Sequence, residues 1–284
     1  MAVVHVNDVD LYYEIYGNHD AFPLVLAYGY CTSINLWKHQ IPPLAERYRV
    51  IAYDARGHGL SSAPAGKEHY TLNHLVGDMR ALLQHLGIEQ AYIAGHSMGG
   101  ATTAGFAAKH PEMTKAALIC NIDGGQQPSD PVADQVAAET RQKAMALVRE
   151  RGLADYARRQ IVDKLAPPFI MANEEEQQIF VTRYAHQPLH GYLGVGEALP
   201  WRDAWLTEAA RKLAMPVAIM MGTEDVMHRG AEILHQYLPQ SHFVSIENAP
   251  HDSMNARPEA FNQGFIEYLE NLEQGKPVAG RRVL

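Results

Sequence analysis

A serine in a glycine-rich turn is the clearest chemical signal in this sequence. Ser97 lies in the segment Gly95-His-Ser-Met-Gly-Gly100, a G-x-S-x-G pattern, between an apolar run at 90–94 and a helical pattern at 101–109. A sharp turn from strand to helix strains the serine backbone, and the small glycines around it permit this conformation. The hydroxyl then projects beside a helix N-terminus, whose dipole favours negative charge. This context predicts that Ser97 is a catalytic nucleophile.

A serine nucleophile needs a base that takes its proton and an acid that orients the base. After a turn of this kind the chain order is serine, acid, histidine. Asp225 follows the apolar run 216–221, and His251 follows the run 242–246. The carboxyl ends of parallel strands face one crevice, so Ser97, Asp225 and His251 are expected to converge there.

Other residues compete for two of these roles. The chain has 15 histidines, and His251 is the one placed on a loop after a strand at the correct point in the order. Glu224 is an alternative acid because it adjoins Asp225, and Asp123 is another because it follows the apolar run 116–120. We prefer Asp225 as the acid and keep Glu224 and Asp123 as alternatives.

The elements that must position these residues are expected from the pattern of apolar residues. An alternating segment at 3–16, interrupted by Asn7-Asp8, predicts an antiparallel hairpin. Continuous apolar runs predict parallel strands that are buried on both faces. Helical periodicity separates these strands, notably at 72–86 and 259–272, and predicts a doubly wound, mostly parallel α/β fold. The six runs are 23–28, 49–53, 90–94, 116–120, 216–221 and 242–246.

This alternation stops between about residues 124 and 206. Helical patterns occupy 132–151, 153–165 and 174–184, and Pro167-Pro168, Pro188 and Pro200 interrupt them. We interpret residues 125–203 as a helical cap inserted into a core formed by 1–124 and 204–284. A second, independent helical domain is the alternative, but the strand–helix pattern resumes after the insertion.

Together these motifs resemble the α/β-hydrolase superfamily, in its esterase- and lactonase-like branch with a helical cap. The resemblance covers about residues 9–124 and 204–272, and it depends on the segments Tyr53–Ser61, Gly95–Gly100, Gly222–Asp225 and Pro250-His251. It implies an α/β-hydrolase fold and a structural role for Asp54 and Arg56. Family members that hydrolyse epoxides or haloalkanes use an aspartate nucleophile, so Ser97 argues against both reactions.

The resemblance also implies an oxyanion hole made of two backbone N–H groups, from Met98 and from Tyr30. Family members usually have His-Gly where this chain has Tyr28-Gly29. Tyr28 either lines the substrate pocket or packs beneath the loop, and the sequence does not separate these two interpretations. In the cap, Trp201 is one of several apolar residues expected to face the substrate.

Composition narrows the remaining classes of function. The 284 residues carry 24 Lys and Arg against 32 Asp and Glu, a net charge of −8, which argues against nucleic acid or an anionic membrane as a partner. Two cysteines exclude a disulfide scaffold and a four-cysteine zinc site. We expect no metal site at His186 and His190, because Pro188 between them breaks a helix.

The N-terminal residues lack the pattern of a signal peptide, and no stretch of about 18 apolar residues occurs. A cytoplasmic protein is therefore expected. The segment 275–284 is expected to be a mobile end or a subunit contact, so a homo-oligomer is compatible with the sequence.

These observations favour a hydrolase without a cofactor that cleaves a small carboxylic ester or lactone through an acyl-enzyme. A carbon–carbon bond hydrolase acting on a diketone would use the same three side chains. A small-molecule receptor that keeps the triad and signals through its cap is an alternative from another class.

Overall fold

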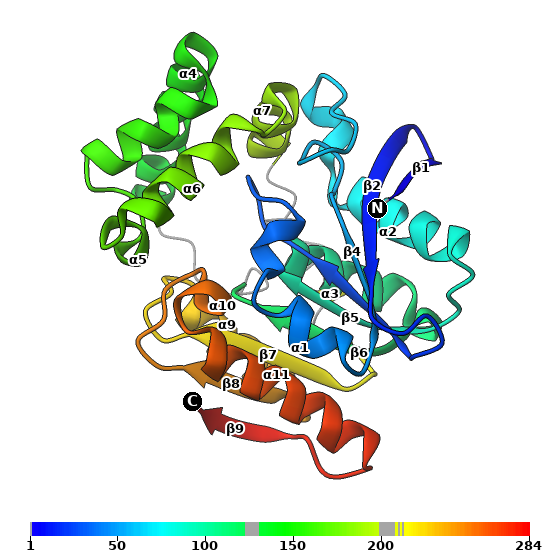
Figure 1. Ribbon diagram of the computed structural model, residues 1–284. Coiled ribbons are helices and arrows are strands. Elements are labelled where there is room, and N and C mark those ends of the chain that lie inside the picture. The colour runs from blue at the N-terminus through cyan, green and yellow to red at the C-terminus, as the bar shows by residue number, and fades with distance from the viewer. Residues whose placement is uncertain (1, 123–130, 199–207, 210, 212) are drawn as a thin grey trace.

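A computed structural model describes residues 2–122, 131–198, 208–209, 211 and 213–284 of the chain. Its centre is one sheet of nine strands in the order β1-β2-β4-β3-β5-β6-β7-β8-β9 (Figure 1). The strands β1 and β2 form an antiparallel hairpin, β2 also pairs antiparallel with β4, and all remaining pairs are parallel. The bounds are β1 Ala2–Val6, β2 Val9–Tyr16, β3 Pro23–Ala27, β4 Arg49–Tyr53, β5 Ala91–His96, β6 Thr114–Cys120, β7 Val217–Gly222, β8 His242–Ile246 and β9 Gly280–Val283.

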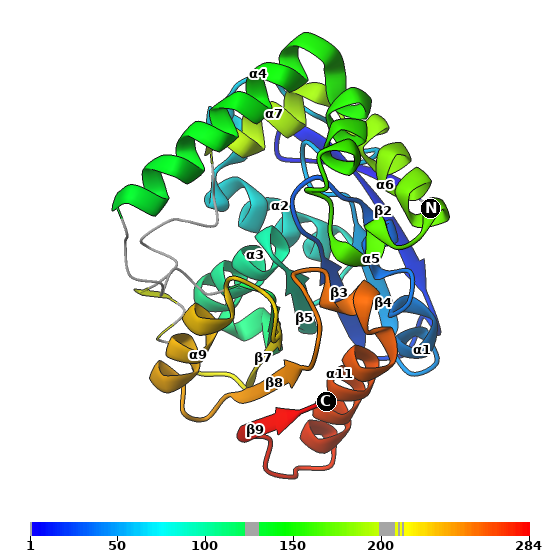
Figure 2. The same cartoon turned by 90° about the vertical axis from the view of Figure 1, so that its left-hand side faces the viewer.

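Helices cover both faces of this sheet, as the doubly wound prediction requires. The apolar faces of α2, α3 and α9 pack in one core cluster, and those of α1 and α11 pack in the cluster on the other face (Figure 2). The Thr71 side chain accepts a hydrogen bond from the His74 N–H and caps α2, which explains where that helix begins. The bounds are α1 Ile41–Ala45, α2 Leu72–His85, α3 Met98–Lys109, α9 His228–Tyr237, α10 Ser253–Ala256 and α11 Pro258–Glu273, with short 3₁₀ turns η1 Ile34–Trp37, η2 Lys67–Tyr70 and η3 Pro111–Met113.

The described part of the segment between β6 and β7 is helical and lies over one end of the sheet (Figure 1). Its helices are α4 Pro131–Val162, α5 Pro168–Met171, α6 Glu174–Ala185 and α7 Leu189–Ala198. Gly152 has φ 82° and ψ 170°, so α4 is two helices joined at a kink, as the patterns at 132–151 and 153–165 predicted. We call α4–α7 the cap helices. The proposed cap limits at 125 and 203 lie outside the described residues and stay a prediction.

The C-terminal segment corrects one expectation. Instead of a mobile end, residues 280–283 form β9, which extends the sheet by pairing parallel with β8. Arg281 and Arg282 on this edge strand form ion pairs with Glu232 and Glu267. A short run with two arginines does not look like a strand in sequence, and only the exposed edge of β8 makes it one.

Candidate active site

Ser97 lies at the turn between β5 and α3, in the strained conformation that the motif predicted. Its φ is 53° and its ψ is −118°, a backbone region that non-glycine residues rarely adopt. The Ser97 N–H donates to the Cys120 carbonyl (2.9 Å), which fixes the turn against β6. A Cβ at Gly99 would lie 2.5 Å from the Ala27 carbonyl carbon, and one at Gly95 would lie 2.1 Å from the Gly99 oxygen. Gly99 is therefore required for the close approach of the turn to β3, and Gly95 for the close approach of α3 to the end of β5.

Asp225 and His251 meet at the same edge of the sheet. Asp225 lies on the loop after β7 and His251 on the loop after β8, and the His251 Nδ1 is 2.9 Å from the Asp225 Oδ2. The Asp225 side chain is inaccessible to solvent. Burial opposes its ionisation, but hydrogen bonds from His251, Met227 and Asn121 lower the pKa of Asp225 to about 2. The carboxyl group is therefore ionised at neutral pH.

The pKa of His251 moves in the opposite direction. Burial lowers it, but the hydrogen bond to Asp225 and the negative charges of Asp225 and Asp252 outweigh burial and raise the pKa of His251 above 6.5. The His251 ring lies against His96, the residue before Ser97, with 4.8 Å between the ring centroids. The His251 carbonyl also lies 3.0 Å from the His96 Nε2. These contacts place the His251 loop directly beside the turn that carries Ser97.

Two polar residues that the sequence analysis did not single out support the Asp225 carboxylate. Asn121 follows β6 and donates from Nδ2 to the Asp225 Oδ2 (3.0 Å). The Ser253 hydroxyl donates to the Asn121 Oδ1 (2.7 Å) and holds the amide in this orientation. Asn121 has φ 52°, a conformation that asparagine tolerates better than most residues. Its position directly after a predicted buried strand was the signal that could have identified it.

The alternative acids differ from Asp225 in where they lie. Glu224 is exposed, whereas the neighbouring Asp225 is buried and bonded to His251. The two adjacent carboxylates on the loop after β7 therefore differ in environment: Asp225 is enclosed by the protein and Glu224 faces solvent. Asp123 lies outside the described residues.

The loop after β3 lies against the N-terminus of α3, where the oxyanion hole is expected. A Cβ at Gly29 would be 3.1 Å from the Ser97 Cβ, so the Gly29 backbone lies directly against Ser97. Tyr30 and Met98 flank this contact on the two segments. Cys31, next in the loop, is buried with φ 60°, and burial raises the pKa of its thiol to about 12. A neutral, buried thiol of this kind does not compete with Ser97 as a nucleophile.

Tyr28 packs beneath the loop, which decides between its two interpretations. It is 2 % exposed, its hydroxyl donates to the Asp54 Oδ1 (2.8 Å), and the Ala55 N–H donates to the same hydroxyl (3.0 Å). The interpretation of Tyr28 as a residue that lines the substrate pocket is therefore wrong, because its side chain points into the core and links two loops. Trp201, the other proposed substrate contact, lies outside the described residues.

Asp54 and Arg56 have the structural role expected of them. Asp54 accepts hydrogen bonds from the Ile34 and Leu60 N–H groups, and the buried Arg56 pairs with Asp78 (2.6 Å). Both residues order the loop after β4.

Within the part of the chain that the structure describes, no cluster of three or more His, Cys, Asp or Glu residues could hold a metal ion. His186 is exposed at the end of α6, and its Nδ1 lies 2.7 Å from the Thr182 carbonyl. None of the described helices is long and apolar enough to cross a membrane. The expected absence of a metal or cofactor stays a prediction.

Comparison with known proteins agrees with this architecture. The model of the alpha/beta hydrolase fold family matches residues 23–255, which include Ser97, Asp225 and His251. The chain belongs to the α/β-hydrolase family. It is 32 % identical over 257 residues to 3-oxoadipate enol-lactonase 2 of Acinetobacter baylyi, covering 90 % of this chain and 91 % of the relative.

Other members of the family are similar as well. A crystal structure of the enol-lactonase from Burkholderia xenovorans LB400 matches 95 % of this α/β hydrolase and 100 % of the other chain, with a TM-score of 0.81 and 26 % identity. Bifunctional epoxide hydrolase 2 of Sus scrofa is 25 % identical over 283 residues, which cover 86 % of this chain and 51 % of the relative. The family therefore includes relatives named for different reactions, and the residues of the site must distinguish between them.

Proposed function

We propose that this α/β hydrolase cleaves carboxylic esters or lactones of small molecules, with Ser97 as nucleophile, His251 as base and Asp225 as the acid that orients it. The observation that carries the proposal is the hydrogen bond between the ionised, buried Asp225 and the Nδ1 of His251. This contact holds a proton on Nδ1 and leaves Nε2 free of a proton, as a general base requires.

The reaction follows from these positions. His251 accepts the proton of Ser97 as the Ser97 oxygen attacks the substrate carbonyl. The N–H groups of Tyr30 and Met98 would stabilise the negative charge that develops on the carbonyl oxygen. His251 then protonates the leaving alcohol, or the ring-opened oxygen of a lactone, and an acyl-enzyme remains on Ser97. Water activated by His251 hydrolyses it and releases the acid.

Two observations favour ester or lactone cleavage. The residue at the strained turn between β5 and α3 is a serine, and two of the similar proteins are named as enol-lactonases. A serine attacks a carbonyl carbon to give an acyl-enzyme, whereas the resemblance assigns epoxide opening to family members with aspartate at this position. A small-molecule ester or lactone is therefore the proposed substrate.

A panel of esters and lactones of increasing acyl length tests this function, with the Ser97→Ala variant as control. We expect hydrolysis by the native protein, a fall in kcat of about 10³-fold or more in the variant, and labelling of Ser97 by a fluorophosphonate. Equal turnover by both proteins, or labelling at another residue, would reject the mechanism. A diketone substrate in the same panel tests the carbon–carbon alternative.

A further inference from the structure

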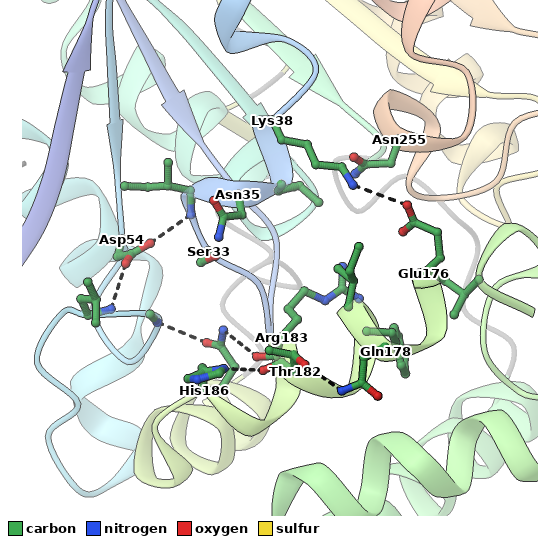
Figure 3. A pocket seen from close by; sticks show the side chains of 18 of the residues that line it. Ser33, Asn35, Lys38, Asp54, Glu176, Gln178, Thr182, Arg183, His186 and Asn255 are labelled. Carbon is green, nitrogen blue, oxygen red and sulfur yellow. Dashed lines mark hydrogen bonds and ion pairs between the residues drawn. The ribbon is translucent and has the colours of Figure 1, made fainter. Parts of the chain in front are cut away.

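A cavity lies between the cap helix α6 and the core. Neither Asp225 nor His251 lines it. Its volume is about 570 Å³, enough for a small organic molecule. It opens between α6, the segment Ser33–Lys38 and the loop after β4 (Figure 3). Much of its wall is apolar, formed by Ile34, Leu36, Phe169, Ile170, Ile179 and Phe180.

Arg183 connects this cavity with the catalytic loops. It lines the cavity from α6, and Figure 3 shows its side chain extending from that helix into the space. Its Nη1 lies 3.9 Å from the Asp252 Oδ2, and Asp252 directly follows His251. Its positive charge also acts on Cys31, which directly follows Tyr30, and opposes the rise of the thiol pKa. The guanidinium therefore lies beside the histidine loop.

The hydrogen-bonding capacity of Arg183 is not used by the described residues. Its Nε is buried and has no hydrogen-bond partner, and the 3.9 Å separation from Asp252 is an ion pair without a hydrogen bond. The Phe180 and Tyr184 rings lie 5.1 and 5.8 Å from the guanidinium carbon. These aromatic faces hold the planar group in place without consuming its N–H donors.

The other charged groups of the cavity are already compensated or lie at its rim. Asp54 accepts its three hydrogen bonds, and Glu14 accepts from the hydroxyls of Tyr12 and Tyr16. Lys38 also forms an ion pair without a hydrogen bond, with Glu176 at 3.6 Å, but its side chain is 39 % exposed against 25 % for Arg183. Glu175 and His186 are exposed. Lys38 and Arg183 therefore both retain donors for a ligand, but Arg183 is the less exposed of the two and lies beside the histidine loop.

We propose that this cavity is a subsite for an anionic group of the substrate, a carboxylate attached to an apolar chain, with Arg183 as its ligand. A guanidinium binds a carboxylate through two parallel N–H donors, and an incoming carboxylate would replace the weak pairing with Asp252. The apolar wall would cover the carbon chain. The inference rests on the proposed function for the reaction that follows binding, but the binding itself does not require turnover.

Calorimetric titration with glutarate tests binding without catalysis. We expect glutarate to bind the native protein and the Ser97→Ala variant equally, and to bind Arg183→Gln at least about 10-fold more weakly, the loss typical of a charge-assisted hydrogen bond. Arg183→Lys should fall between them because it keeps the charge and loses the planar fork. Lys38→Gln is the matched control, since it removes a cation of the same cavity that is paired with Glu176.

Hydrolysis of two matched esters tests substrate selection. p-Nitrophenyl pentanoate and p-nitrophenyl hydrogen glutarate differ by a methyl group in place of a carboxylate. Arg183→Gln should lower kcat/KM for the glutarate ester at least about 10-fold more than for the pentanoate ester, mainly through KM. Lys38→Gln should leave the ratio within about twofold.

The possible outcomes separate the two proposals. Absence of glutarate binding to the native protein, or equal weakening by Arg183→Gln and Lys38→Gln, would overturn the anionic subsite. An equal loss with both esters would mean that Arg183 acts on the catalytic loops and not on the substrate carboxylate. Glutarate binding that depends on Arg183, in a protein that hydrolyses neither ester and resists fluorophosphonate, would reject the proposed hydrolysis and retain the subsite.

Discussion

The Tyr30 hydroxyl donates a hydrogen bond to the Tyr192 carbonyl (2.5 Å), and the two rings stack with their centroids 4.9 Å apart. Tyr192 belongs to cap helix α7, and Tyr30 belongs to the loop of the proposed oxyanion hole. A Cβ at Gly196, one turn further along α7, would lie 2.7 Å from the Tyr30 Oη, so the helix is close to this hydroxyl. The cap therefore contacts the same residue whose N–H is expected to stabilise the oxyanion.

Removing this contact should affect turnover more than binding. Tyr30→Phe keeps the stacked ring and removes the hydroxyl, so we expect kcat to fall by about 3- to 10-fold with a smaller change in KM, and stability to fall by about 1 kcal/mol. Steady-state kinetics and a melting curve measure both. Tyr48→Phe is the control. This variant also loses one tyrosine hydroxyl hydrogen bond, the one to Glu273 (2.9 Å), on the α11 side of the sheet. An equal loss of kcat in both variants would remove any specific role for the contact with Tyr192.

The two adjacent carboxylates after β7 should respond very differently to neutralisation. Asp225→Asn removes the charge that holds the His251 tautomer, and we expect kcat to fall by about 10³- to 10⁴-fold with the fold retained. Glu224→Gln changes an exposed side chain and should alter kcat by less than about twofold. Measurement of kcat for both variants at one pH decides the assignment. The reverse ranking would move the acid to Glu224.

Asn121 should act as a positioning residue through Asp225. Asn121→Gly removes the side-chain amide. Glycine adopts φ 52° readily, so the substitution adds no backbone strain that could itself lower the activity. Loss of the donor leaves more carboxylate charge facing His251, which raises the pKa of His251, so the acidic limb of the kcat/KM profile should move to higher pH. We also expect kcat to fall by about 10-fold. Ser253→Ala, which removes only the partner of the amide, should cause a smaller shift. A fall in kcat with an unmoved limb would indicate loss of packing alone.

The pH dependence of activity should follow His251. The base must be neutral, so kcat/KM falls as the pH drops through the raised pKa of His251. The hydrogen bond and charge of Asp225 raise the pKa of His251 against the effect of burial. In Asp225→Asn, the acidic limb of the residual activity should therefore lie at lower pH than in the native protein. Profiles between about pH 5 and 10 test this. A limb at the same pH in both proteins would show that another group controls it.

His251 and Asp225 should contribute to the free energy of unfolding with opposite dependences on pH. The folded pKa of His251 is raised, so its contribution is fully present below the unfolded pKa of about 6.5 and is lost as the pH rises through the folded value. The pKa of Asp225 is lowered to about 2, so its contribution is present above about 3.9 and is lost as the pH falls towards 2. Melting temperatures of the native protein and Asp225→Asn should therefore converge at the acidic end. A constant difference down to about pH 2 would contradict this linkage.

Much of the fold could be predicted from the sequence because its signals are local. The six apolar runs correspond to β3–β8 within about two residues, because strands buried on both faces are continuous in hydrophobicity. Ser97 was identified for the same reason: a strand, a turn with glycines and a helix occupy consecutive residues. The order of Asp225 and His251 followed from the rule that parallel strands open to one crevice, which depends on topology and not on side-chain detail.

Other features were decided only by contacts between distant segments. β9 forms because an edge of β8 is available to pair with it. The helix α7 begins one residue after Pro188, in a part of the predicted cap where no helical pattern had been identified. The inward orientation of Tyr28 depends on Asp54, 26 residues away, and the support of Asp225 depends on Asn121, 104 residues away. Arg183 approaches Asp252 across the cap–core boundary. The sequence determined which residues follow which strands, but side-chain direction, burial and partner depend on how the elements pack, and only the tertiary structure contains that information.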